Sequence, residues 1–161
     1  MTRDEVRELF DYDAETGELR WRKHRYAPWV GTVAGGVQKD GYRRVCFQTQ
    51  YRCKSYPAHR LIWLWVYGEW PPVYIDHINM DKDDNRLVNL RLATRSQNLA
   101  NQRSFNKNGF KGISPVGSRW RANIQKDRKS RYLGTFDTPE QAHAAYCEAA
   151  KQVHGEFMRS K

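Results

Sequence analysis

The chain has 161 residues and a formal net charge of +10, so it holds one ordinary domain or two small ones and indicates a polyanionic partner. No apolar run approaches the roughly 18 residues that span a bilayer, and no apolar leader opens the chain, so we expect a cytoplasmic protein without a membrane partner. Three scattered cysteines without a CxxC pair argue against a disulfide framework and against structural zinc.

The first third of the sequence predicts a short helix followed by strands. Thr2 and Glu5 form a capping box that begins the helix. Four strand-like segments follow, separated by glycines, at residues 18–23, 30–34, 42–47 and 51–56. Basic side chains alternate with apolar ones along them, which indicates a sheet with one basic face. That face either contacts DNA or is simply solvated.

A nearly continuous apolar segment at residues 59–67 predicts a buried helix. Gly68 is the expected C-cap, and the following Pro71-Pro72 pair cannot continue a helix. His59 stands at the helix start. A histidine flanking a core helix is more often a hydrogen-bonded structural residue than a ligand, and both readings stay open here.

The central segment, residues 73–102, concentrates the polar residues. A predicted strand at 73–78 ends in an Asp76-His77 pair, a polar loop follows at 79–85, and a second strand is expected at 90–93. Thr94 and Gln97 form a second capping box, which places Asn98 on the first turn of a helix.

These residues suit phosphodiester hydrolysis, which needs a base for the water and a cation for the phosphate and leaving oxygen. Asp76 and Asn98 offer oxygen ligands to one divalent ion, and oxygen ligands favour Mg²⁺ or Mn²⁺. His77 points the other way from Asp76 on a strand, toward the attacking water, and Asn89 has a carbonyl that can accept from its ring N–H. The competing interpretation is a turn-rich loop that happens to carry these residues.

The C-terminal third predicts a second module after a polar connector. Residues 120–125 alternate strictly between core-facing and outward-facing side chains, and residues 131–136 read as a further strand. Thr138 as N-cap and Pro139 in the first turn predict the start of a helix. The expected fold class is α+β: an N-terminal small antiparallel sheet plus a ββα-metal core, then a three-stranded antiparallel sheet packed on one helix. The expected domains are 1–103, a 104–109 linker and 110–161.

The strings HRLIW, IDHIN, DDNRLVNLR and AT-SQN, between His59 and Asn101, resemble the HNH endonucleases of the phage intron and freestanding homing type. The resemblance implies a ββα-metal hairpin and helix in which Asp76 and Asn98 hold one divalent ion. It also implies that His77 is the general base and that Asn89 orients it. Many HNH proteins have His at the last motif position; Asn98 lowers the expected affinity for transition metals.

The strings FKGIS, WRANI and YLGTFDTPEQAHAAY resemble a second family, the Apetala/ethylene-response-factor type DNA-binding domain. In that family the three-stranded sheet enters the major groove. The motif positions imply DNA contacts by Lys111, Arg119, Arg121, Asn123, Gln125 and Tyr132. Ser114 and Ser130 stand where basic residues are common, so no target sequence transfers. The alternative is a basic domain that holds the phosphate backbone without reading bases.

Together these patterns predict a metal-dependent DNA endonuclease of phage or mobile-element origin, acting in the bacterial cytoplasm. A single metal attacks one strand per site, so a nick by a monomer is the default and a dimer is the alternative. Two other hypotheses are a DNA-binding regulator with an inactive nuclease scaffold, and an RNA-directed protein.

Overall fold

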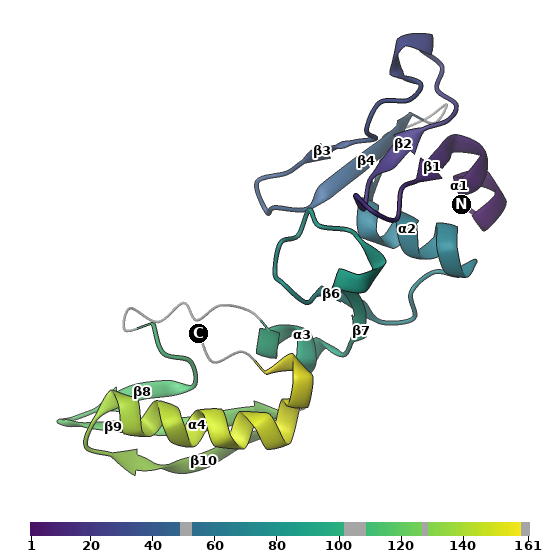
Figure 1. Cartoon of the computed structure of the whole chain (residues 1–161). Coiled ribbons are helices and arrows are strands. Elements are labelled where there is room, and N and C mark those ends of the chain that lie inside the picture. Colours follow the sequence, from purple (N-terminus) through teal and green to yellow (C-terminus); the bar gives the residue numbers. More distant parts are fainter. Residues whose placement is uncertain (49–52, 102–108, 127–128, 159–161) are drawn as a thin grey trace. The chain divides into compact units, whose positions relative to one another are not determined.

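A computed structural model describes the whole chain except residues 49–52, 102–108, 127–128 and 159–161 (Figure 1). The chain forms two compact units, Met1–Leu92 and Ala93–Lys161, each with its own core. Helices and small sheets are mixed in both units, which confirms the α+β class. No helix within the described ranges is long and apolar enough to cross a membrane.

The first unit ends at Leu92, whereas the sequence places the end of the nuclease domain at residue 103. The limits 1–103, 104–109 and 110–161 therefore stay a prediction. Most of the expected linker lies outside the described residues.

The first unit begins with α1 (Arg3–Leu9), and the Thr2–Glu5 capping box is formed as expected. A small hairpin of β1 (Phe10–Tyr12) and β2 (Leu19–Trp21) follows, then the 3-10 turn η1 (Ala27–Trp29). A three-stranded antiparallel sheet comes next, in the order β3 (Gly36–Val37), β4 (Arg43–Gln48) and β5 (Cys53–Pro57).

The strand expected at residues 30–34 is wrong. This segment is a turn-rich connection that lies beside β2. Arg20 and Val33 form one bridge, and residues 31, 32 and 34 make backbone hydrogen bonds to Trp21 and Leu19. Gly31 has a φ of +83°, which is a left-handed conformation that interrupts a strand. The start of the strand expected at 51–56 lies outside the described residues.

Helix α2 (Ala58–Tyr67) is the centre of the first core. Gly68 ends it in the left-handed conformation with a φ of +85°, as its position predicts. Leu61, Ile62 and Leu64 are almost fully buried. Together with residues of α1, β1, β2 and β4 they form one apolar cluster, against which the polar central segment is placed.

The central segment forms a two-stranded sheet of β6 (Tyr74–His77) and β7 (Leu90–Ala93). Between the strands lie the polar loop and a 3-10 turn, η2 (Leu87–Asn89). The Ile78 amide donates to the Asn89 carbonyl at 2.9 Å, which fixes the two ends of the loop against each other.

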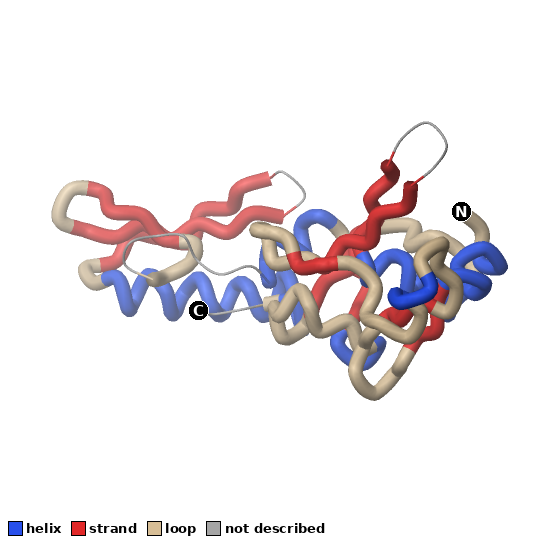
Figure 2. The backbone as a smooth tube through the Cα atoms, turned by 90° about the horizontal axis from the view of Figure 1, so that it is seen from above, coloured by secondary structure: helices blue, strands red, loops and turns tan. Residues whose placement is uncertain are grey.

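The second unit contains α3 (Arg95–Asn101) and an antiparallel sheet packed on one long helix. The sheet order is β10 (Lys129–Phe136), β9 (Arg119–Lys126) and β8 (Ile113–Val116). Helix α4 (Pro139–His154) runs along the strands (Figure 2), and η3 (Gly155–Phe157) follows it. Ala122, Ile124, Ala142 and Tyr146 are buried between sheet and helix, which confirms the expected three-strand-plus-helix unit.

Candidate active site and nucleic-acid surface

Asp76 and His77 end β6 and are each only 4% exposed. A buried carboxylate needs a partner, and Arg91 on β7 supplies it. The Nε and Nη2 atoms of Arg91 both lie 2.9 Å from Oδ2 of Asp76. The strand pairing of β6 with β7 therefore also orients the carboxylate that the sequence assigns to the metal.

The His77 imidazole packs against two other rings. The ring centroid of His59 lies 5.2 Å away, edge-on, and that of Tyr42 lies 5.8 Å away. Burial lowers the pKa of His77 below its usual range, and the Asn85 hydrogen bond and the Asp76 carboxylate offset that shift only in part. The ring is thus neutral near pH 7, as a general base must be. The imidazole is more enclosed than the water-facing position that strand alternation predicts, because the rings of Tyr42, just before β4, and of His59 on α2 pack against it.

Asn85 sets the orientation of this ring. Its Oδ1 lies 3.1 Å from Nε2 of His77, and its Nδ2 donates to the Asp83 carbonyl at 3.0 Å. The second bond fixes which end of the amide faces the ring, so Nε2 carries the proton in the neutral imidazole. The lone pair is then on Nδ1, which is the nitrogen able to accept a proton.

Asn89 closes the loop rather than contacting the ring through its side-chain amide. Its Oδ1 accepts from the Asn79 amide at 2.9 Å, and its Nδ2 donates to the Asp84 carbonyl at 2.8 Å. The sequence analysis missed Asn85. It follows Asp83 and Asp84 in the DDNRLVNLR string, but its spacing alone did not assign it a role, and only the fold brings it to His77.

The acidic loop side chains are used to hold the loop. Arg43 makes two hydrogen bonds to the Asp83 carboxylate, at 2.8 and 2.9 Å. Arg86 does the same to Asp84 and lowers the pKa of that carboxyl to about 2. Across the described ranges, no three His, Cys, Asp or Glu side chains lie together as a metal-binding group.

The N-terminal turn packs directly on this loop. Gly17 has a φ of +77°, and a Cβ atom there would lie 2.5 Å from the Arg86 amide nitrogen and 2.7 Å from the Asn85 carbonyl carbon. The Tyr12 hydroxyl also bonds the Asn85 carbonyl, at 3.2 Å. The backbone that carries Asn85 is therefore held from the first hairpin.

Asn98 lies on the first turn of α3, as predicted. Thr94 and Gln97 bond each other's backbone amides at 2.8 and 3.2 Å, which completes the capping box. The Asn98 amide donates to the Thr94 carbonyl at 2.9 Å, and its side chain is partly exposed. Asp76 belongs to the first unit and Asn98 to the second, so their shared metal ion stays a prediction.

Strand β9 alternates as the sequence predicts. Ala122 and Ile124 are buried, whereas Arg121 and Gln125 are exposed on the other face. Asn123 is partly exposed on that same face.

Two further residues assigned to DNA contact already have partners within the protein. Arg119 pairs with Asp137 at 2.8 Å, and the Tyr132 hydroxyl lies 2.7 Å from Oγ1 of Thr135. Tyr132 is nevertheless 59% exposed.

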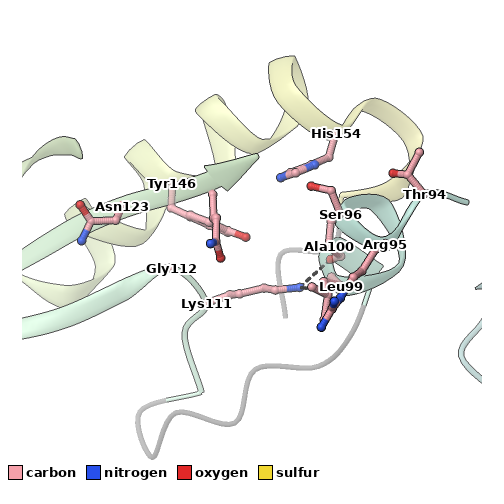
Figure 3. Close-up of a pocket in the computed structure, with 11 residues that line it drawn as sticks. Thr94, Arg95, Ser96, Leu99, Ala100, Lys111, Gly112, Asn123, Tyr146 and His154 are labelled. Atoms are coloured by element: carbon pink, nitrogen blue, oxygen red, sulfur yellow. Dashed lines mark hydrogen bonds between the residues drawn. The ribbon is translucent and has the colours of Figure 1, made fainter. Parts of the chain in front are cut away.

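Lys111 extends from the start of the sheet module to helix α3 (Figure 3). Its Nζ donates to the Leu99 carbonyl at 3.1 Å and to the Ala100 carbonyl at 2.5 Å. A cation at these carbonyls satisfies groups that the helix end leaves without partners and complements the helix dipole. A cavity of about 760 Å³ lies beside this contact, lined also by Asn123, Tyr146 and His154.

The sequence of this chain is similar to those of known nucleases. The family model for HNH endonucleases matches residues 56–100. An uncharacterized HNH endonuclease of Acanthamoeba polyphaga mimivirus is 34% identical over 133 residues, covering 81% of this chain and 67% of that protein. Protein 3.8 of Escherichia phage T7 is 31% identical over 111 residues, covering 66% of this chain and 91% of that protein.

A solved structure, titled for DNA binding and cleavage by the HNH homing endonuclease I-HmuI, is 28% identical in sequence with a TM-score of 0.44. The match covers 58% of this chain and 51% of that chain, so this chain spans about half its length. The chain belongs to the HNH endonuclease family and is a nuclease by class.

Proposed function

We propose that this protein is a metal-dependent endonuclease that nicks or cuts duplex DNA. The observation that carries the proposal is the Asp76-His77 pair at the end of β6, with its carboxylate held by Arg91 and its imidazole by Asn85. A buried, neutral and oriented histidine beside a fixed carboxylate is what base-catalysed hydrolysis requires.

In this mechanism Nδ1 of His77 accepts the proton of the attacking water, while Asn85 holds Nε2–H. The Asp76 carboxylate and the Asn98 amide oxygen fit a hard divalent ion, Mg²⁺ or Mn²⁺, which would offset charge on the phosphate and on the leaving oxygen. Asn89 acts through the loop that it closes. One such centre cleaves one strand, so the proposed product of a monomer is a nick.

The second unit is proposed to supply DNA binding and target choice. Its basic sheet face, with Arg121, Asn123 and Gln125, has side chains able to bond base edges in the major groove. The three-strand-plus-helix fold supports the proposed resemblance to the Apetala/ethylene-response-factor type domain. The phage relatives support an origin in a phage or mobile element and action in a bacterial host.

Plasmid relaxation tests the proposal. The intact protein should convert supercoiled plasmid to the nicked form with Mg²⁺ or Mn²⁺ and not with EDTA. His77→Ala should nick about 10²- to 10⁴-fold more slowly, the usual contribution of a general base, while retarding DNA equally on a gel.

The second candidate is a DNA-binding regulator with an inactive nuclease scaffold. The Asp76–Arg91 pair is the observation in its favour, because a guanidinium already neutralises the carboxylate. DNA retardation without nicking by either protein would support this candidate and contradict the first.

A further inference from the structure

An aromatic cleft in the first unit, away from the Asp76-His77 pair, is not used by the proposed mechanism. It lies between the 24–29 turn and the β3–β4 edge, with a volume of about 870 Å³. Tyr26 is 54% exposed and Trp29 is 52% exposed. Two large aromatic side chains half open to water line the same cleft, and clustered exposed apolar surface of this kind is typical of ligand-binding grooves.

The rings form an ordered stack. The His24 imidazole lies 5.0 Å from the Trp29 indole at an interplanar angle of 12°. Two other rings flank the imidazole: Trp21 edge-on at 4.5 Å and Tyr26 at 5.8 Å. His24 therefore covers one face of Trp29. Because Trp29 is still half exposed, its other face is the open one.

The turn that carries the stack is fixed by hydrogen bonds. The Trp29 carbonyl accepts from the Thr32 hydroxyl at 2.7 Å, and the Trp29 amide donates to the Tyr26 carbonyl at 3.1 Å. Nδ1 of His24 accepts from the Tyr26 amide at 3.1 Å. A site whose rings are already in place loses little entropy when a flat ligand stacks on it.

Charge selects the ligand. The Arg25 guanidinium lies over the Tyr26 ring with 4.8 Å between its Cζ and the ring centroid. Arg44 also lines the cleft, and its guanidinium is paired with the exposed Asp40 carboxylate at 3.0 Å. Among the described residues that line the cleft, none is acidic. Open aromatic faces next to arginines suit a nucleobase together with its phosphate, and a base offers its face only when it is unstacked from its neighbours.

We propose that this cleft is a stacking site for an unpaired nucleobase of the DNA substrate, with Trp29 and Tyr26 as the stacking faces and Arg25 and Arg44 holding the adjacent phosphates. This stacking-site proposal rests on the proposed function in one respect, which is that the ligand is DNA. Binding a base outside the helix would let the first unit grip a locally opened strand near the cleavage site.

The experiment measures binding of the full-length protein, in EDTA, to a labelled oligothymidylate of about eight nucleotides. An abasic oligonucleotide with the same number of phosphates is the comparison ligand. The oligothymidylate should bind about 5- to 150-fold more tightly, the range for stacking one base on an aromatic ring. Trp29→Ala should remove most of that difference, and Trp29→Phe should keep part of it.

Tyr67→Ala is the matched control, because Tyr67 is also 54% exposed in the first unit but lies outside the cleft. It should leave the difference unchanged, while Tyr26→Ala reduces it. Equal affinity for the two oligonucleotides would overturn the proposal, as would a preference for bases that survives Trp29→Ala in a protein with a normal circular dichroism spectrum. Since no cleavage is measured, loss of nicking and loss of stacking are separate results.

Discussion

The Nε2 atom of His77 lies 3.1 Å from the amide oxygen of Asn85, and both side chains are almost completely buried. Through this contact, Asn85 determines which nitrogen of the His77 imidazole carries the lone pair. Asn85→Leu should therefore slow nicking about 10- to 100-fold, the range seen when a partner that orients a metal-site imidazole is lost.

DNA retardation by Asn85→Leu should be unchanged. Asn79→Ala is the control, because it removes an exposed amide from the same loop without touching His77. Asn85→Asp keeps the acceptor oxygen and adds a charge, so it should raise the pKa seen in the pH–rate profile. An unaltered profile would show that Asn85 does not act through the ring.

Arg91→Ala should lower the free energy of unfolding by about 3–5 kcal/mol, because it leaves the buried Asp76 carboxylate without its ion pair. Lys23→Ala removes a comparable pair with Glu8 on the surface, where both side chains are more than 60% exposed, and should destabilise the protein far less. Urea unfolding of both variants measures the difference.

Mg²⁺ should restore more stability to Arg91→Ala than it adds to the wild type, since the cation can replace the guanidinium beside Asp76. The double variant with Asp76→Ala should not respond. A response that persists in the double variant would place the metal elsewhere.

Acid should destabilise the first unit through His59. Burial lowers the pKa of His59 to about 3, while an unfolded chain protonates near pH 6.5. The unfolded state then binds the proton first, so this contribution to stability is complete above pH 6.5 and is lost as the pH falls toward 3. The loss is at most about 1.4 kcal/mol per pH unit. Urea unfolding across this range should show it, and His59→Gln should flatten the slope.

Lys111→Met should loosen helix α3, because the Lys111 ammonium no longer bonds the Leu99 and Ala100 carbonyls. Hydrogen exchange of the α3 amides should become faster by an amount equivalent to about 1–3 kcal/mol. Nicking should fall with it, since α3 presents Asn98, and Lys111→Arg should rescue part of both effects. Weaker DNA binding with unchanged α3 exchange would instead support the direct DNA contact expected from sequence.

Arg121→Ala separates base reading from backbone binding. If Arg121 reads a base, the variant should lose about 1–3 kcal/mol of binding free energy on the preferred target only. If Arg121 contacts a phosphate, binding should weaken equally on all sequences, and the slope of log affinity against log salt concentration should become smaller by about one. Arg119→Ala should have a smaller effect, because that guanidinium is already paired with Asp137. Competition binding on specific and random duplexes at several salt concentrations distinguishes these outcomes.

Local signals were sufficient for much of the fold. The Thr94–Gln97 capping box, the Gly68 end of α2 and the alternation of β9 each depend on neighbours in sequence, and the structure has all three. The segment at 30–34 failed because its β-branched residues suggested a strand while Gly31 turns the chain.

The site was less predictable because its geometry comes from distant segments. The sequence singled out Asp76, His77, Asn89 and Asn98. Asn85 and Arg91 lie in the same DDNRLVNLR string, but their roles depend on loop closure and strand pairing and were not assigned. The sequence assigned Lys111 to DNA and did not indicate the contact of its ammonium with the carbonyl end of α3; the DNA contact stays a prediction. Side-chain partners across a fold are not encoded in local spacing.

The fit of Gly17 against the backbone of Asn85 and Arg86 makes the amino-terminal hairpin part of the machinery of its own unit. A methyl group added at this turn would displace the loop that fixes the imidazole. A chimera that takes its amino-terminal hairpin from a relative should therefore keep its cleavage rate only if that hairpin has a glycine at this position. For protein engineering, the hairpin is not a detachable module.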